Sequence, residues 1–197
     1  LTPMRLTVQS FEQRFLKEKP YSDKKIKEFC NILIEQIDTM KDVANTFSDF
    51  AALPQAKLKS LDIVEISKRS LEIFEQNKID FSSSHPKIFV DLDRTQWVRV
   101  MTNLIQNGIQ SVPIESKAKL KVEIKKLMKE VQVDFTDNGV GISNSIKDKI
   151  FEPKFTTKTK GMGLGLGIVK NIVNSHGGKI NYSSSSKGTK FTITLKI

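Results

Sequence analysis

The chain has 197 residues, of which 38% are hydrophobic and 27% charged, and its formal net charge is +10. This composition is typical of a soluble globular protein, and no apolar run reaches the roughly 20 residues that a membrane-spanning helix needs. A single cysteine, Cys30, excludes an internal disulfide. It fits a reducing compartment, so we expect a cytoplasmic location for this part of the protein.

The excess of lysine raises the question of nucleic-acid binding, because basic surfaces attract phosphate. The lysines are scattered singly and in pairs from Lys17 to Lys196, often beside Asp or Glu, without interleaved aromatic residues. We therefore interpret them as solvated surface and expect no nucleic-acid partner. A basic DNA-binding protein stays as an alternative, which salt-dependent binding to duplex DNA would reveal.

Residues 1–52 carry an apolar pattern that predicts a helical hairpin. Apolar residues recur at alternating steps of three and four, and Pro20 separates two such series. The series are Leu1, Met4, Val8, Phe11 and Phe15, and then Ile26, Phe29, Leu33, Ile37, Met40, Ala44, Phe47 and Ala51. Two such stripes cannot bury each other completely, so we expect a homodimer that forms a four-helix bundle. Packing of the hairpin onto the rest of the same chain is the alternative.

Pro54 ends the second helix, and the pattern then changes to alternating strands and helices. We place a linker at residues 53–57 and a second domain at 58–197. The fold class is therefore α+β, a helical hairpin followed by an α/β sandwich.

Within the second domain, the local patterns predict individual elements. Asp62 and Asp93 each precede a helical pattern, with Glu65 and Gln96 three residues further on, as in a capping box. Strands are predicted at 87–91, 119–126, 131–137, 178–185 and 190–197, with a hairpin turn at 127–129 and a polar loop at 82–86.

The helix after Asp93 carries Asn103 and Asn107, four residues apart and so on one face. Asparagine is a poor helix former, so two of them within a helix need a reason. A carboxamide oxygen is a hard, neutral ligand that suits Mg²⁺, an ion that usually also contacts substrate phosphates. A solvated polar stripe explains this helix equally well.

The segment VQVDFTDNGVGIS places Asp137 on the same strand face as Val131, Val133 and Phe135. A carboxylate at the end of a core-facing row is unusual unless a group pairs with it. Gly139 and Gly141 follow, so the backbone can turn sharply and approach a ligand closely. We interpret Asp137 as an acceptor in a pocket, with an ordinary Asp-Asn-Gly hairpin turn as the alternative.

The segment KGMGLGLGIVKNIV leads four alternating glycines into a helical pattern. Glycines at the start of a helix expose backbone N–H groups and the positive end of the helix dipole to an anion. The preceding FEPKFTTKTK contains Lys154, Lys158 and Lys160 and could close over phosphates as a lid. The glycines are Gly161, Gly163, Gly165 and Gly167.

In this order, the segments NLIQNG, DNGVGI, FEPKFTTK and GMGLGLG resemble the N box, first glycine box, F box and second glycine box of sensor histidine kinases. These kinases belong to the GHKL ATPase superfamily. The resemblance covers 58–197 and implies a Bergerat-type sandwich with a mixed sheet and helices on one face. The hairpin before it resembles a dimerisation and phosphotransfer domain. The opening LTP resembles the end of an H box of the nitrogen-regulation type, which implies a phosphoacceptor histidine just before Leu1.

The resemblance implies that ATP and Mg²⁺ are the cofactors. Asp137 would accept a hydrogen bond from the adenine amine, with Gly141 allowing close approach of the base, and Gly139 is a further implied ATP-binding residue. Asn107 would ligate Mg²⁺, and Asn103 would help to position the ion or the phosphates. The other implied ATP-binding residues are Lys158, Gly161, Gly163, Gly165 and Leu166.

Three positions depart from the family pattern. Gln110 stands where many of these kinases have a phosphate-binding lysine, and Gly167 replaces a small Ser or Ala. The helix start should be looser for that glycine. Lys154 stands where an aromatic or apolar residue is common.

The implied activity is that of a protein-histidine kinase, which transfers the ATP γ-phosphoryl to a histidine of the hairpin and then to an aspartate of a response regulator. Asn103 stands where gyrase and MutL-type ATPases have a water-activating glutamate, so hydrolysis should be slow. His85 and His176 lack an orienting partner in the sequence and are weak candidates for catalysis. We therefore expect this chain to bind ATP without phosphorylating itself, and leave open a membrane anchor upstream in the parent protein. A nucleotide-responsive docking module without catalysis is the alternative.

Overall fold

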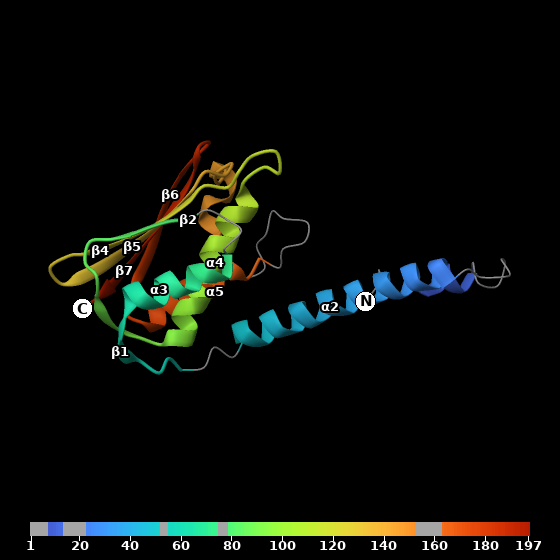
Figure 1. Ribbon diagram of the computed structural model, residues 1–197, viewed down its shortest axis with the longest axis horizontal. Helices are drawn as coiled ribbons and strands as arrows, with labels where there is room; N and C mark the ends of the chain where they lie inside the picture. The colour runs from blue at the N-terminus through green and yellow to red at the C-terminus, as the bar shows by residue number, and fades with distance from the viewer. Residues whose placement is uncertain (1–7, 14–22, 52–54, 75–78, 153–162) are drawn as a thin grey trace. The chain divides into compact units, whose positions relative to one another are not determined.

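The chain divides into two units, Leu1–Leu53 and Pro54–Ile197. The structure, a computed structural model, describes residues 8–13, 23–51, 55–74, 79–152 and 163–197 (Figure 1). None of the helices in these ranges is long and apolar enough to cross a bilayer.

The first unit contains the long helix α2, Asp23–Ala51, and residues 8–13 are helical as well. The rings of Phe11 and Phe29 stack with their centroids 3.8 Å apart, so the two predicted apolar series meet. Ile26 and Ile37 of the second series nevertheless stay 39% and 51% exposed. Within the described residues, the apolar stripe of α2 is therefore only partly covered. Leu1, Met4, Phe15 and Pro20 lie outside the described residues.

The second unit alternates strands and helices along the chain. Its strands are β1 (Lys59–Asp62), β2 (Ile79–Ser83), β3 (Phe89–Leu92), β4 (Leu120–Lys126), β5 (Glu130–Asp137), β6 (Lys179–Ser185) and β7 (Gly188–Lys196). Its helices are α3 (Ile63–Leu71), α4 (Arg94–Ser111) and α5 (Gly165–Ser175), with 3-10 segments η1 (Glu72–Phe74) and η2 (Asn144–Lys149).

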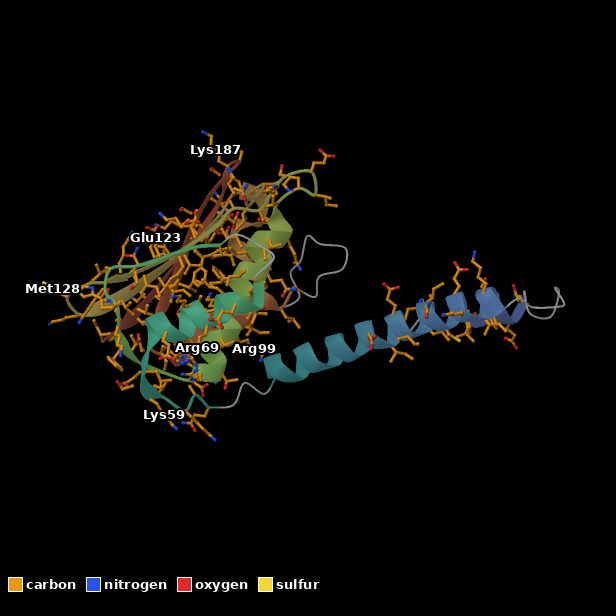
Figure 2. All side chains as sticks on the ribbon, in the orientation of Figure 1. Lys59, Arg69, Arg99, Glu123, Met128 and Lys187 are labelled. Atoms are coloured by element: carbon orange, nitrogen blue, oxygen red, sulfur yellow. The ribbon has the colours of Figure 1, made fainter. Side chains whose placement is uncertain are left out.

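Five strands form one sheet in the order β2-β4-β5-β7-β6. β2 runs parallel to β4 and the other pairs are antiparallel, so the sheet is mixed. β1 and β3 form a separate antiparallel pair. The hairpin turn between β4 and β5 is confirmed, because Leu127 N donates to Glu130 O at 2.8 Å. Met128 lies at its tip (Figure 2).

Helices α3, α4 and α5 cover one face of this sheet (Figure 1). α3 contacts β2, α4 contacts β4 and β5, and α5 contacts β6. The contact layer is apolar, as the helical and alternating patterns predict. Its buried side chains include Trp97, Val100, Met101, Leu104 and Ile105 of α4, and Val131, Val133 and Phe135 of β5. The predicted α+β fold with a mixed sheet and helices on one face is thus confirmed.

The caps of α3 and α4 differ from each other. Asp93 accepts from Gln96 N at 3.1 Å, as the capping box predicts. Asp62 instead accepts from Val64 N and from Ile88 N, both at 3.1 Å, so it also ties the start of α3 to the segment before β3. The first aspartate therefore caps a helix and joins two segments at once.

His176 links the end of α5 to the start of α4. Its Nδ1 lies 2.7 Å from Ile172 O, an acceptor, so Nδ1–H donates, and Nε2 accepts from Asp93 N at 3.0 Å. Burial raises the pKa of Asp93, but backbone N–H donors, led by Gln96, outweigh burial and hold that pKa below its ordinary value. α4 and α5 are therefore antiparallel, which brings the start of α5 to the second half of α4.

The sequence pattern did not predict β1 and β2, and the predicted loop at 82–86 was partly wrong because Ser82 and Ser83 belong to β2. Both strands are short, and β2 ends in serines that alone favour a turn. β2 forms because β4 offers it a parallel partner, with Phe81 opposite Val122. Such tertiary pairing is invisible in a local pattern.

Candidate functional site

Asp137, the last residue of β5, has one carboxylate oxygen held by the protein. Oδ1 accepts from Gly139 N at 2.8 Å, from Thr189 N at 3.1 Å and from Ser111 Oγ at 3.3 Å. These donors come from the turn after β5, from β7 and from α4. Oδ2 accepts no hydrogen bond from any described residue. The carboxylate is therefore fixed in orientation and keeps one oxygen for a ligand.

The turn that follows Asp137 does not return to a neighbouring strand. β5 is followed along the chain by η2, and the strand beside it, β7, comes much later. The alternative of an ordinary Asp-Asn-Gly hairpin turn is therefore wrong.

Glycines let the backbone pack tightly around this carboxylate. A Cβ on Gly139 would collide with the Ser111 hydroxyl, and one on Gly141 would collide with Ser185 O. Gly141 also has a φ of 75°, in the left-handed region that favours glycine. On the helix side, a Cβ on Gly108 would lie 3.3 Å from Asp137 Cβ. Gly108 and Gly139 thus flank Asp137 and its donor Ser111 from two sides, whereas Gly141 packs against β6.

Asn103 and Asn107 face the first residue of α5. Asn103 Nδ2 donates to Arg99 O at 2.8 Å, which fixes the amide and leaves its oxygen on the side of α5. A Cβ on Gly165 would lie 2.9 Å from Asn103 Oδ1 and 3.7 Å from Asn107 Nδ2. The two asparagines are half-buried against a neighbouring helix. The alternative of a solvated polar stripe does not fit this contact.

The start of α5 offers backbone donors. Leu164 is the N-cap residue, and no side chain of the residues that the structure describes caps the helix. The first N–H groups of α5 are therefore available to an anion, at the positive end of the helix dipole. Gly163 precedes them with a φ of 65°, and Leu166 is half-buried in the first turn. Lys154, Lys158, Lys160 and Gly161 lie outside the described residues.

The carboxamide oxygens of the two asparagines also decide which metal ion the site could hold. Within the described residues, no three His, Cys, Asp or Glu side chains come together. Asn103 and Asn107 beside a helix N-terminus fit Mg²⁺, because this ion takes oxygen ligands and shares them with phosphates and water.

The segment that begins the F box is anchored by aromatic packing. The Phe151 ring lies edge-on to Tyr182 and Phe191, with centroids 6.0 Å and 6.5 Å away, and Lys170 Nζ lies 5.4 Å from its centroid. Tyr182 OH donates to Lys147 O at 3.0 Å. Burial, assisted by the Asp148 charge, raises the pKa of Tyr182 and keeps the phenol protonated. Lys147 and Phe151 are thus fixed to the sheet.

Sequence reasoning missed Ser111 and Thr189 as partners of Asp137. Thr189 is 5% exposed, and its Oγ1 lies 3.0 Å from Ser184 Oγ. The signal was a small polar residue on the same strand face as Phe191 and Ile193, a position that usually carries an apolar side chain. Ser111 gave no signal, because its contact depends on how α4 lies across β5.

A family model described as histidine kinase-, DNA gyrase B-, and HSP90-like ATPase matches residues 92–197. The nitrogen regulation protein NtrY of Azorhizobium caulinodans is 28% identical over 207 residues, which cover 100% of this chain and 27% of that protein. This chain therefore spans about a quarter of that relative.

Two solved structures are similar to this chain. The catalytic domain of histidine kinase ThkA is 30% identical with a TM-score of 0.65, covering 71% of this chain and 95% of that one. Histidine kinase ThkA in complex with response regulator protein TrrA is 23% identical with a TM-score of 0.75, covering 99% of this chain and 59% of that one. The second likeness is one of fold, and it extends over both units.

Proposed function

Since this chain belongs to the histidine kinase-, DNA gyrase B- and HSP90-like ATPase family, we propose that it is the kinase portion of a two-component sensor histidine kinase. Its second unit binds Mg-ATP. The γ-phosphoryl passes to a histidine of the dimerisation domain and then to an aspartate of a response regulator. The similarity to sensor kinases such as NtrY, over the whole chain, supports this proposal.

The single observation that carries the nucleotide site is the half-satisfied carboxylate of Asp137. Three donors hold Oδ1, whereas Oδ2 has no donor among the described residues. The exocyclic amine of adenine carries two protons in the plane of the ring, and one of them can donate to this single oxygen. Oδ2 therefore binds the adenine amine.

The phosphate end of the nucleotide lies at the start of α5. The N–H groups of Gly165 and Leu166 bind phosphate oxygens, and Asn103 Oδ1 with Asn107 would hold Mg²⁺ beside them. Bound Mg²⁺ would neutralise charge that develops during phosphoryl transfer. Lys158, in the segment between Phe151 and α5, is a second cation for the phosphates beside Mg²⁺.

The chemistry favours transfer over hydrolysis. Asn103 occupies the α4 position nearest the first residue of α5, and a carboxamide cannot take a proton from water as a carboxylate can. Transfer of the phosphoryl group to water is therefore slow, and the group is transferred to a better nucleophile, the imidazole of a histidine.

The accepting histidine is not one of the two in this chain. Both ring nitrogens of His176 are engaged with backbone groups, and His85 lies in the loop after β2 within the second unit. We infer that another segment of the parent protein supplies the acceptor and that the hairpin presents it in a homodimer. The partly covered stripe of α2 supports the dimer.

The proposed partner is the receiver domain of a response regulator. Histidine kinase ThkA, whose catalytic domain is 30% identical to this chain, has been solved in complex with response regulator protein TrrA. We propose a cytoplasmic location for the unit that meets this partner.

Calorimetry of Mg-ATP binding tests the nucleotide site. Asp137→Asn removes the anionic acceptor at nearly constant shape and should weaken binding about 10- to 100-fold, the effect of losing a hydrogen bond to a charged group. Glu123→Gln, the same change on the opposite face of the sheet, should leave the affinity unchanged. Equal binding by the chain and by Asp137→Asn would show that Asp137 does not contact the base.

Phosphotransfer needs a separate experiment, because a docking module could bind ATP without chemistry. This chain is mixed with a full-length partner whose own ATP site is inactive but whose H box is intact. Acid-labile phosphohistidine on the partner supports the kinase, whereas nucleotide binding without phosphohistidine supports the docking module.

A further inference from the structure

β2 is an edge strand with an open hydrogen-bonding edge. Ser84 N donates to Ile124 O at 2.9 Å, and in a parallel ladder alternate residues turn both backbone groups to the same neighbour. The even-numbered residues of β2 therefore face β4. The N–H and C=O groups of Ile79, Phe81 and Ser83 face away from it and make no backbone hydrogen bond to another described residue.

The opposite edge of the sheet, formed by β6, differs from β2 in its sequence and its contacts. β6 begins with Lys179, and its side chains contact the segment before it: Tyr182 OH donates to Lys147 O at 3.0 Å and Ser184 Oγ accepts from Ile142 N at 2.8 Å. Proteins usually protect an open edge with lysine, proline or a covering segment. β2 has the sequence IDFSS, without lysine or proline.

A cavity of about 490 Å³ lies beside the open edge of β2, lined by α3, β2 and the loop after β2. Val64, Phe81 and Pro86 give it an apolar lining, and Ser83 belongs to both the cavity and the edge. A strand added to β2 would direct alternate side chains to this side of the sheet. The cavity therefore has the position and the chemistry to take one apolar side chain of such a strand.

The uncompensated charge around the cavity is positive. Lys68 and Lys87 line it and make no ion pair with a described residue. The two acids in the lining are already engaged: Asp62 accepts from two backbone N–H groups, and Glu65 pairs with Arg69 at 3.1 Å. A strand with carboxylates two residues before and after its apolar side chain, and therefore on the same face as that side chain, complements this rim.

We propose that β2 binds an extended acidic segment of a partner protein as an additional strand of the sheet. The backbone of the segment pairs with Phe81 and Ser83, one apolar side chain enters the cavity, and carboxylates meet Lys68 and Lys87. The proposal is independent of nucleotide binding, because none of these residues belongs to the Asp137 or α5 sites.

The probe is a blocked synthetic heptapeptide, Thr-Glu-Thr-Val-Thr-Glu-Thr, which as a strand places its valine and both glutamates on one face. It is titrated into the whole chain and followed by amide NMR. Binding should shift the amide signals of Phe81 and Ser83 and slow their hydrogen exchange, because both N–H groups gain an acceptor. The matched control peptide has lysine in place of glutamate and should bind about tenfold more weakly. Unchanged Phe81 and Ser83 amides, or equal binding of the two peptides, would overturn the proposal.

Variants separate the backbone contact from the charge contact. Ser83→Pro removes an edge N–H without removing a bond to β4 and should weaken the acidic peptide about tenfold, whereas Ser83→Ala should not. Lys68→Glu with Lys87→Glu leaves the backbone intact and should also lose about tenfold, whereas Lys179→Glu with Lys196→Glu, a matched charge change elsewhere, should lose little. Mg-ATP affinity, measured in parallel, should be the same in all four and reports correct folding. Peptide binding unaffected by both Ser83→Pro and the Lys68, Lys87 pair contradicts strand addition at β2.

Discussion

Asp134 and Asp137 lie on the same strand, yet β5 gives the first carboxylate a complete set of partners and the second only half a set. Asp134 points to the helix-free face and is 0% exposed. Gln132 Nε2 donates to both of its oxygens, Thr192 Oγ1 donates to Oδ1 at 2.9 Å, and Lys190 Nζ lies 2.9 Å from Oδ2. Asp137, at the end of the strand, has every described donor on Oδ1.

The difference separates a structural carboxylate from a binding carboxylate. Burial raises the pKa of Asp134, but the hydrogen bonds from Lys190, Thr192 and Gln132 outweigh it and hold that pKa below its usual value. Such a group stabilises the fold and has nothing left to offer a ligand. Asp137 keeps one oxygen for a ligand, so its removal should cost binding more than stability. Substitutions at the two positions should separate these two effects.

The largest expected effect is on the stability of Asp134→Ala. The change leaves the half-buried Gln132 and Thr192 donors without their acceptor and should lower the free energy of unfolding by about 2–3 kcal/mol. Urea unfolding followed by fluorescence of Trp97, which is 0% exposed, measures this loss. Glu123→Ala is the control, because Glu123 on the same face makes only a partly exposed ion pair with Lys121 and should cost less than about 1 kcal/mol. Similar losses in both variants would refute the assignment of Asp134.

The next effect concerns ligand-induced stabilisation. Mg-ATP at about 100 times its dissociation constant should raise the free energy of unfolding by about 2.7 kcal/mol in the unmodified chain and in Asp134→Ala, provided that the ligand binds only the folded state. Asp137→Asn should gain much less at the same concentration, because its affinity is lower. The same urea titration with and without nucleotide gives the answer. If Mg-ATP stabilised Asp137→Asn as much as the unmodified chain, Asp137, like Asp134, would have no role in nucleotide binding.

The sequence predicted the position of Asp137 but not the environment of Asp134. Alternation placed Asp137 on the core face with Val133 and Phe135, and this face is the one that α4 covers. The same alternation puts Asp134 on the helix-free face, where a carboxylate is expected to be solvated. It is buried because Lys190, Thr192 and Lys125 from the neighbouring strands close over it, a contact set by strand register. A local pattern gives the face of a residue, and only the partner strands decide its exposure.

The secondary structure was likewise predictable where a local pattern was strong and not where pairing with another strand decided it. Apolar patterns predicted α4, β5 and even the short β3, whereas β1 and β2 escaped because KSLD and IDFSS contain serine and aspartate, which favour turns. Of the site, the residues on regular elements could be placed from spacing alone, and Asn103 and Asn107 lie together as expected. Their meeting with Gly165 depends on the antiparallel packing of α4 and α5, which His176 helps to fix through Asp93.

A smaller effect is expected from Ser111→Ala, which removes one of the three donors to Asp137 Oδ1. The loosened carboxylate should bind Mg-ATP about three- to tenfold more weakly, in line with one ordinary hydrogen bond. Thr102→Val is the control on the same helix, because its hydroxyl, like that of Ser111, donates to a carbonyl of α4 but does not reach Asp137. Calorimetry on both variants tests whether orientation of Asp137 matters. A loss in Thr102→Val as large as in Ser111→Ala would indicate a general effect on the helix.

The smallest effect appears only in acid. Because the pKa of Asp134 is lowered in the folded state, its contribution to stability is present above the unfolded pKa of about 3.9 and is lost as the pH falls through the lower folded value. The difference in unfolding free energy between the unmodified chain and Asp134→Asn should therefore stay constant from neutral pH down to about pH 4 and shrink below it. Urea titrations of both proteins at stepped pH values measure this difference. A difference that persists undiminished in acid would mean that Lys190 and the other donors do not favour the charged form of Asp134.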